Sequence, residues 1–384
     1  MTLTKQKVYL FNWPSPVGGA GTKVTHLLRL LHGDYEWIAV PNTEAQYSDN
    51  KVRGWLRRLG VKAARWEDLP PRLEGWGLCI CNTWWLLEGR AVEAHARGLR
   101  LVWSSEMMWH HMAELGAVGA GVLDAVLFVS SGQRAALAES YAQMSGATLP
   151  QRSAALRMPQ VAEPGLREKV LSGKLGRVRW VETGNYIDPA CYRWRDRRRG
   201  SVKGGEFVIG RLSRAAVEKF PADFPDSYEN LGLRGEVRAR VMAWSEELSA
   251  RWPGMGGKDA PLNWELLRAM EEEPSAFLRS LDLFVYELGP RCRESWGRAA
   301  VEAMLCGAVP LVPRGGGHHL EHLVRHGESG FLCGDRREFS ENARLLQDDA
   351  ARRFQMSRAA RDWAAGELCH AERHRRMWRE VFEG

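Results

Sequence analysis

Short apolar runs of strand length alternate along the chain with longer stretches in which apolar residues recur at helical spacing. In the first half, the strand-like runs cover residues 7–13, 36–40, 78–82, 100–106 and 125–131. Helix-compatible stretches lie between them, at 22–32, 50–60 and 90–99. Strands that alternate with helices favour a parallel, doubly wound sheet. The first half is therefore predicted to be a parallel α/β domain.

The alternation weakens over about 146–176, and one more strand is predicted within 177–188. An Arg-rich stretch and a Gly-rich piece follow, which is typical of a linker. After it, strand-like runs resume at 206–213, 239–244, 281–288, 308–312 and 330–334. The chain should therefore contain a second parallel sheet.

These patterns predict four parts along the chain. They are an N-terminal domain (1–190), a linker (191–205), a C-terminal domain (206–365) and a terminal helix (366–384) that packs back on the first domain. The last stretch is compatible with two amphipathic helices, interrupted near Gly366 and crossing between the domains. Because open α/β sheets bind ligands at the carboxyl ends of their strands, two such domains should face a ligand-binding cleft.

Two carboxylates stand eight residues apart where the 281–288 run gives way to an Ala-rich helix former. Inside one helix, Glu294 and Glu302 would differ by about 80° in rotation and roughly 12 Å along the axis, so they should hold different parts of an elongated ligand. Between them, the amides of Ser295, Trp296 and Gly297 begin the helix and suit a phosphate. A nucleoside diphosphate sugar has this layout of hydroxyl, phosphate and hydroxyl groups.

Three further segments follow predicted strands. Gly18 and Gly19 allow backbone amides to approach a phosphate or sugar, although a plain tight turn explains them equally well. Arg211 and Lys219 are suited to neutralising a leaving diphosphate. A triple glycine, 315–317, likewise permits close backbone approach to a ligand.

Chain length and composition limit the number of domains, the metal sites and the cellular location that we expect. The 384 residues exceed what one core usually supports, and the net charge is +7. The seven cysteines suggest free thiols, and their spacing provides no zinc site. No apolar run reaches the length of a membrane span and no signal-peptide core is present, so a cytoplasmic location is expected.

A run of arginines concentrates positive charge in the predicted linker, at Arg193, Arg195, Arg197, Arg198 and Arg199. Such a run is most often a solvated loop. The alternatives are contact with a polyanion, with a membrane surface or with a phosphorylated acceptor.

The ordered motifs resemble those of the retaining nucleotide-sugar glycosyltransferases of family 4. They are Gly210-Arg211-Leu212 with Lys219, the Glu294 to Glu302 spacing, the triple glycine with Glu321, and Gly327-Glu-Ser-Gly330-Phe-Leu. The resemblance covers about 206–335, and in the first half only the Gly18-Gly19 loop and 126–137 agree. It implies the GT-B fold, which has two Rossmann-like domains.

The resemblance also implies roles for individual residues. Arg211 and Lys219 would contact the donor diphosphate, although the interval between them is longer than usual in the family. Glu294 would bind donor-sugar hydroxyls, the amides of Ser295 to Gly297 would lie near the phosphate, and Glu302 would bind the ribose.

An N-terminal histidine of this family commonly contacts the donor sugar or the acceptor. His110 or His111 would take that role, with a purely structural histidine as the equal alternative. On the acceptor side, Glu106 would orient the attacking hydroxyl and Trp109 would stack on a sugar or base.

The implied reaction transfers a hexose with retention of configuration, through attack on the face from which the diphosphate leaves. It needs neither a metal nor a prosthetic group, and a UDP-sugar is the expected donor. The acceptor would be a saccharide, a lipid-linked or a small-molecule hydroxyl. Alternatives are hydroxymethylated bases of DNA as acceptor, a non-hydrolysing nucleotide-sugar epimerase, a pyridoxal-phosphate-dependent phosphorylase, or a nucleic-acid-binding module.

Overall fold

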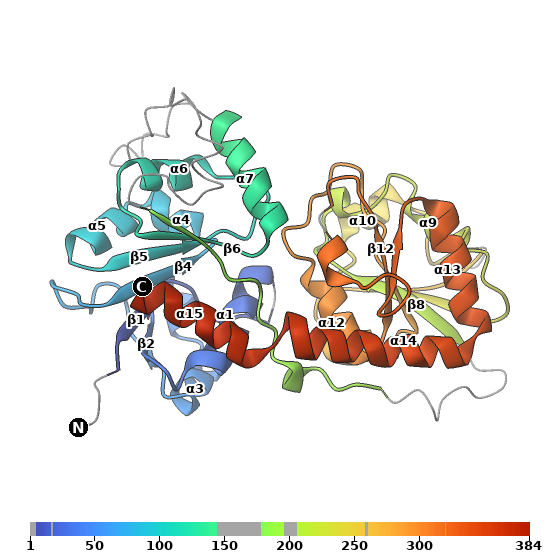
Figure 1. Ribbon diagram of the computed structural model, residues 1–384, viewed down its shortest axis with the longest axis horizontal. Coiled ribbons are helices and arrows are strands. Elements are labelled where there is room, and N and C mark those ends of the chain that lie inside the picture. The colour runs from blue at the N-terminus through green and yellow to red at the C-terminus, as the bar shows by residue number, and fades with distance from the viewer. Residues whose placement is uncertain (1–4, 17, 144–177, 196–205, 258–259, 319) are drawn as a thin grey trace. The chain divides into compact units, whose positions relative to one another are not determined.

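The computed structural model describes residues 5–16, 18–143, 178–195, 206–257, 260–318 and 320–384 (Figure 1). Its contacts divide the chain into two compact units, Met1–Tyr186 with Ala371–Gly384, and Ile187–His370. Most of the predicted linker, 196–205, lies outside the described residues, and so do Arg197, Arg198 and Arg199.

The first unit is built on a sheet of seven parallel strands in the order β3-β2-β1-β4-β5-β6-β7. The strands are β1 (Lys7–Leu10), β2 (Glu36–Ala39), β3 (Lys62–Ala63), β4 (Trp76–Ile80), β5 (Arg100–Ser104), β6 (Ala125–Phe128) and β7 (Arg179–Glu182). β4 and β6 are buried along their whole length, as expected for parallel strands covered on both faces.

Helices connect these strands and cover the sheet (Figure 1). They are α1 (Gly19–Leu31), α2 (Glu44–Tyr47), α3 (Asn50–Arg58), α4 (Thr83–Leu87), α5 (Arg90–Ala96), α6 (Met112–Gly119), α7 (Ser131–Gln143) and the C-terminal α15 (Ala371–Glu383). α15 shares a core with β1, β2 and α1, where Trp378 and Phe382 are buried. The Trp76 Nε1 donates a 2.6 Å hydrogen bond to the Phe382 carbonyl oxygen, which fixes the end of α15 to β4.

The second unit has six parallel strands in the order β10-β9-β8-β11-β12-β13. The strands are β8 (Phe207–Leu212), β9 (Val237–Met242), β10 (Asn263–Leu267), β11 (Leu283–Val285), β12 (Val309–Pro313) and β13 (Phe331–Cys333). The α-helices are α9 (Phe224–Glu229), α10 (Glu246–Arg251), α11 (Pro274–Ser280), α12 (Arg298–Cys306), α13 (Arg336–Asp348) and α14 (Ala350–Trp363).

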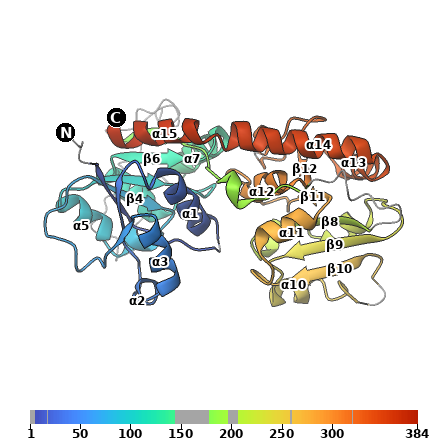
Figure 2. The same ribbon diagram turned by 90° about the horizontal axis from the view of Figure 1, so that it is seen from below.

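Shorter helical turns complete this unit. They are the 3₁₀ turns η2 (Pro189–Cys191), η4 (Val217–Lys219) and η5 (Glu321–Leu323), and the π-helical turn η6 (Ala364–Leu368). α14 packs against α12, as both views show (Figures 1 and 2). The break at η6 contains Gly366, where the sequence predicts an interruption between two helices.

The predicted alternation of strands and helices is confirmed, and every strand pair in the described residues is parallel. Two strands of the structure were not predicted from the sequence pattern. β3 has only two residues, and the edge strand β10 carries polar Asn263 and Glu265 among its apolar residues. In the first sheet, β2 and β3 lie on one side of β1, and β4 to β7 lie on the other side. In the second sheet, β9 and β10 lie on one side of β8, and β11 to β13 lie on the other. The strand order therefore reverses between β1 and β4 and between β8 and β11, and each of these places is a topological switch point.

Candidate active site

The predicted donor motifs of the second unit converge at one edge of its sheet. β8, β11 and β12 are adjacent and parallel, so the segments after their carboxyl ends meet. These segments carry Lys219, Glu294 and the triple glycine 315–317, respectively. The switch point between β8 and β11 lies at this edge, which is where open α/β sheets bind ligands.

Lys219 and Glu294 form an ion pair between the segments that follow β8 and β11. The Lys219 Nζ contacts the Glu294 Oε1, and both side chains are largely buried. The hydroxyl of Tyr286 donates a 2.9 Å hydrogen bond to the same oxygen. Burial, and secondarily the Glu294 charge, hold the pKa of Tyr286 well above its usual value, so it remains a donor. A carboxylate is thus fixed by one cation and one hydroxyl.

Arg211, the expected diphosphate contact, has no exposed surface. Its guanidinium lies over the Phe220 ring at 4.2 Å from the centroid and near the rings of Phe224 and Tyr286. Its two terminal nitrogens donate hydrogen bonds of 2.8 and 2.9 Å to the carbonyl oxygens of Glu287 and Lys219. The Arg211 side chain therefore binds carbonyl oxygens of the protein's own backbone.

The turn before α12 brings backbone amides to this edge. Gly297 caps the helix with a φ of 79°, and a Cβ there would lie 2.5 Å from Leu320 and 2.7 Å from Leu323. Only glycine fits both this conformation and this space. Trp296 is buried beside it. Ser295, Trp296 and Gly297 therefore stand at a helix N-terminus, as the sequence predicts.

Glu302 lies on the inward face of α12 and is almost fully buried. Its Oε1 is 3.3 Å from the Arg298 guanidinium, one helical turn earlier, and its carboxyl also hydrogen-bonds with Tyr192. Burial raises the pKa of this carboxyl. The expected ribose contact thus falls on a carboxylate that is already paired within its own unit, because the helix turns it toward the interior.

The triple glycine after β12 makes a tight backbone curve. Gly315, Gly316 and Gly317 all have positive φ, from 64° to 73°. The Gly315 amide donates a 2.6 Å hydrogen bond to the Glu321 carboxylate, so the loop already binds a negatively charged group. The His318 Nδ1 lies 2.8 Å from the Cys292 carbonyl oxygen, which ties this loop to the one that carries Glu294.

The other predicted glycines belong to the first unit. Gly18, with a φ of 82°, precedes α1 at the switch point between β1 and β4. A Cβ added at Gly18 or Gly19 would meet nothing within 4 Å. The start of α1 is therefore open, and backbone conformation rather than crowding favours glycine at position 18.

Glu106, predicted on the acceptor side, takes part in a buried polar cluster of the first unit. Its Oε1 is 2.5 Å from the Lys23 Nζ and accepts a 2.9 Å hydrogen bond from the Ser104 hydroxyl. Its Oε2 is 3.5 Å from the Asn185 side-chain nitrogen. Lys23 itself is almost completely buried on α1. Most of the hydrogen-bonding capacity of this carboxylate is therefore used internally.

The three neighbouring candidates, Trp109, His110 and His111, have different surroundings. His110 is buried, with its Nδ1 3.1 Å from the Glu114 carboxylate. The His111 Nδ1 accepts a 3.1 Å hydrogen bond from the Ala113 amide and so caps α6. Trp109 is 53% exposed, in contrast to the buried Trp103 on β5. Only Trp109 presents a large open surface.

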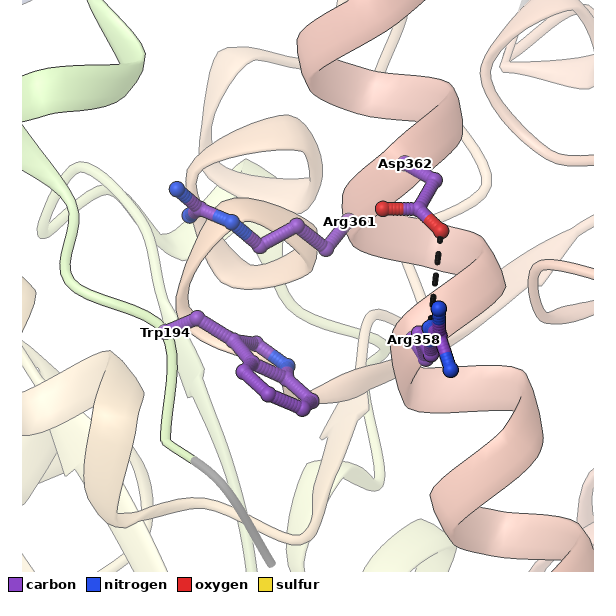
Figure 3. Close-up of a pocket in the computed structure, with 4 residues that line it drawn as sticks. All are labelled: Trp194, Arg358, Arg361 and Asp362. Atoms are coloured by element: carbon purple, nitrogen blue, oxygen red, sulfur yellow. Dashed lines mark ion pairs between the residues drawn. The ribbon is translucent and has the colours of Figure 1, made fainter.

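A separate pocket of about 290 Å³ lies elsewhere in the second unit (Figure 3). Trp194, Arg358, Arg361 and Asp362 line it, and Arg358 pairs with Asp362 at 3.9 Å. The Trp194 ring lies against Gly307, which precedes β12. The pocket therefore lies toward the amino end of β12, away from the segments that carry Lys219 and Glu294.

Two further features concern metals and membranes. Within the described ranges, no three His, Cys, Asp or Glu residues are grouped so that they could hold a metal ion. None of the helices that the structure describes combines the length and apolar character needed to cross a bilayer.

Sequence reasoning missed Tyr286, Lys23 and Arg298. Tyr286 follows the apolar strand β11 directly and reads as a core residue, and only the fold shows its hydroxyl on Glu294. Lys23 looks like a surface position of an amphipathic helix, yet it is buried. The spacing of four residues between Arg298 and Glu302 was the one available signal for a helical ion pair.

Comparisons with known proteins match this architecture. Residues 264–363 match the family model described as "Glycosyl transferases group 1". No curated protein sequence matches the chain significantly. Among solved structures, HepE of Anabaena in complex with UDP and glucose is 15% identical, with a TM-score of 0.66 over 99% of this chain and 100% of that one.

Two other structures are similar over the whole chain. Sucrose-phosphate synthase from Thermosynechococcus elongatus is 12% identical, with a TM-score of 0.63 and coverage of 99% and 100%. A trehalose-6-phosphate synthase is 13% identical, with a TM-score of 0.60 and coverage of 99% of both chains. The chain therefore has the GT-B fold with two Rossmann-like domains, and its second unit contains a region that matches the glycosyl transferases group 1.

Proposed function

We propose that the protein is a retaining glycosyltransferase that moves a hexose from a nucleoside diphosphate sugar to an acceptor hydroxyl. The single observation that carries this proposal is the Lys219–Glu294–Tyr286 cluster beside the amides that begin α12, at the switch point of the second sheet. It combines a fixed carboxylate for sugar hydroxyls with a cation and helix-terminal amides for phosphate. The match of 264–363 to the glycosyl transferases group 1 supports it.

The proposed reaction needs no nucleophile from the protein. The acceptor oxygen forms a bond to the anomeric carbon on the face from which the diphosphate departs. The bond between that carbon and the diphosphate oxygen breaks, and this oxygen accepts the acceptor's proton. Lys219 and the amides of Ser295, Trp296 and Gly297 stabilise the negative charge that develops on the diphosphate.

We propose a UDP-sugar as donor. The support is that HepE of Anabaena, which has the same fold, is described in complex with UDP and glucose and with UDP-glucose. For the acceptor we propose a saccharide, lipid-linked or small-molecule hydroxyl, with the exposed Trp109 ring available for stacking. Lys219 and helix amides supply positive charge, so transfer should not depend on a divalent metal.

The test is a panel of UDP-, GDP- and ADP-sugars in a thermal-shift assay, followed by turnover with the donor that stabilises the protein. Acceptors should include oligosaccharides and hydroxymethylated DNA, each with and without EDTA. A UDP-sugar should raise the Tm and be consumed equally well in EDTA. If no nucleotide sugar binds or is consumed, the proposal is wrong, and if Mn²⁺ is required, its metal-independent part is wrong.

A further inference from the structure

Arg211 is the most deeply buried cation near the candidate site, with no exposed surface. A buried charge is costly unless other groups replace its hydration. Here the rings of Phe220, Phe224 and Tyr286 face the guanidinium, and two backbone carbonyl oxygens accept its hydrogen bonds. The protein's own groups therefore surround this charge and satisfy its two terminal nitrogens, while the Arg211 Nε has no hydrogen-bond partner among the described residues.

The two carbonyl oxygens belong to the two segments that carry the ion pair. One is that of Lys219 itself, at the end of η4, and the other is that of Glu287, just after β11. Glu294 follows later on the same segment as Glu287. A single planar guanidinium thus joins the backbone that carries the cation to the backbone that leads to the carboxylate.

A glycine contact brings the same two segments close together. A Cβ added at Gly289 would lie 2.6 Å from the carbonyl oxygens of both Glu218 and Phe220, the residues on either side of Lys219. No side chain fits in that space. The relative position of the two segments is therefore set by two independent features, the Arg211 hydrogen bonds and the absence of a side chain at Gly289.

We infer that Arg211 is a positioning residue, which acts on donor binding and transfer only by holding Lys219 against Glu294. This inference rests on the proposed function and gives Arg211 a role other than contact with the diphosphate. The fork geometry suits it, because two parallel N–H donors can reach two carbonyl oxygens while an ammonium group acts as a point charge.

The test is a double-mutant cycle between Arg211→Met and Lys219→Met, read as kcat/KM with the donor found in the panel. Each single change should lower kcat/KM by about 10²-fold, on the order of one lost electrostatic contact in a site. Because Arg211 acts through Lys219, adding Arg211→Met to the Lys219→Met enzyme should change kcat/KM by less than about twofold. Independent contacts of both residues with the diphosphate would make the two effects multiply, which would overturn the inference.

A charge-conserving change separates positioning from charge. Arg211→Lys keeps the positive charge and loses the fork, so it should be nearly as damaging as Arg211→Met. Recovery of most of the wild-type kcat/KM in Arg211→Lys would show that charge alone suffices. That result would also overturn the inference.

Gly289→Ala supplies a variant that removes no charged group and covers the case in which Arg211 variants do not fold. It should force the two segments apart, lower kcat/KM, and lose its effect in the Lys219→Met background. A Gly289→Ala effect that multiplies with Lys219→Met would contradict the inference. If the wild-type protein bound no nucleotide sugar, the proposed function itself would fail, and UDP titration calorimetry on the wild type distinguishes that outcome.

Discussion

The ammonium group of Lys219 pairs with the carboxylate of Glu294, 75 residues later in the chain. The contact joins the segment after β8 to the segment after β11, two neighbouring strands of one sheet. It places a cation where a diphosphate is expected and fixes the carboxylate that would hold the donor sugar.

Replacing Lys219 by Met should reduce kcat/KM by about 10²-fold, since one group that stabilises the leaving diphosphate is lost. Steady-state kinetics with the stabilising UDP-sugar measures this. Lys62→Met is the matched control, because Lys62 also pairs with a glutamate, Glu36, but on the exposed surface of the first unit. If the Lys219→Met and wild-type enzymes were equally active, Lys219 would not contribute to the active site.

Tyr286→Phe should lower kcat/KM about tenfold while the ring continues to pack. The change removes only the hydrogen bond to Glu294, and a tenfold loss corresponds to about 1.4 kcal/mol. Tyr228→Phe is a strict control, because that buried hydroxyl donates a 2.6 Å bond to the Val285 carbonyl oxygen in the same sheet. Both variants should lose some stability in urea titrations, and only Tyr286→Phe should lose activity. An equal loss of activity in both would indicate a general packing effect.

Gly297→Ala should destabilise the second unit by about 1–3 kcal/mol, through strain at positive φ and overlap with Leu320 and Leu323. Gly54→Ala offers the opposite case, because Gly54 lies inside α3 and its added Cβ would come no closer than 3.8 Å to Arg58. That change should raise the free energy of unfolding by about 0.4–1 kcal/mol. Chemical denaturation measures both, and a stable Gly297→Ala protein would contradict the cap geometry.

The stability of the protein should fall in mildly acidic solution because of His318. Burial lowers the pKa of His318 from its ordinary value of 6.5. Below that pH the unfolded chain binds a proton that the folded protein resists, so the free energy of unfolding decreases until the pH passes the folded pKa.

His318→Gln should therefore flatten the dependence of Tm on pH as the pH falls below the ordinary histidine pKa of 6.5. His95→Gln, at an exposed position on α5, should leave the dependence unchanged. A decline of the same size in the His318→Gln protein would show that other groups cause it.

Sequence reasoning identified features whose signal is local and missed features that depend on packing between distant segments. The turn that leads from β11 to α12, with Gly297 before the helix and Gly307 after it, follows from a strand run, a breaker-rich segment and an alanine-rich helix former. The burial of Arg211 does not, because it depends on rings from two separate segments, Phe220 and Phe224 after β8 and Tyr286 after β11.

The inward orientation of Glu302 and the pairing of Glu106 were also not predicted, because they too depend on contacts between distant segments. Glu302 faces inward because of how α12 is rotated against its unit, and one spacing in the sequence cannot fix that rotation. Glu106 looked available at the end of a strand, but Lys23 on α1 reaches it from 83 residues earlier. Contacts between distant segments therefore decide which of the predicted polar residues remain free to bind a ligand.

The most direct test of nucleotide-sugar transfer with retention is NMR of the anomeric proton during the reaction. The wild-type protein is incubated with an α-configured UDP-sugar and the acceptor identified in the panel. UDP and an α-linked product should appear together, and Lys219→Met should slow both. A β-linked product would contradict retention, and failure to consume any nucleotide sugar would contradict the proposed transfer itself.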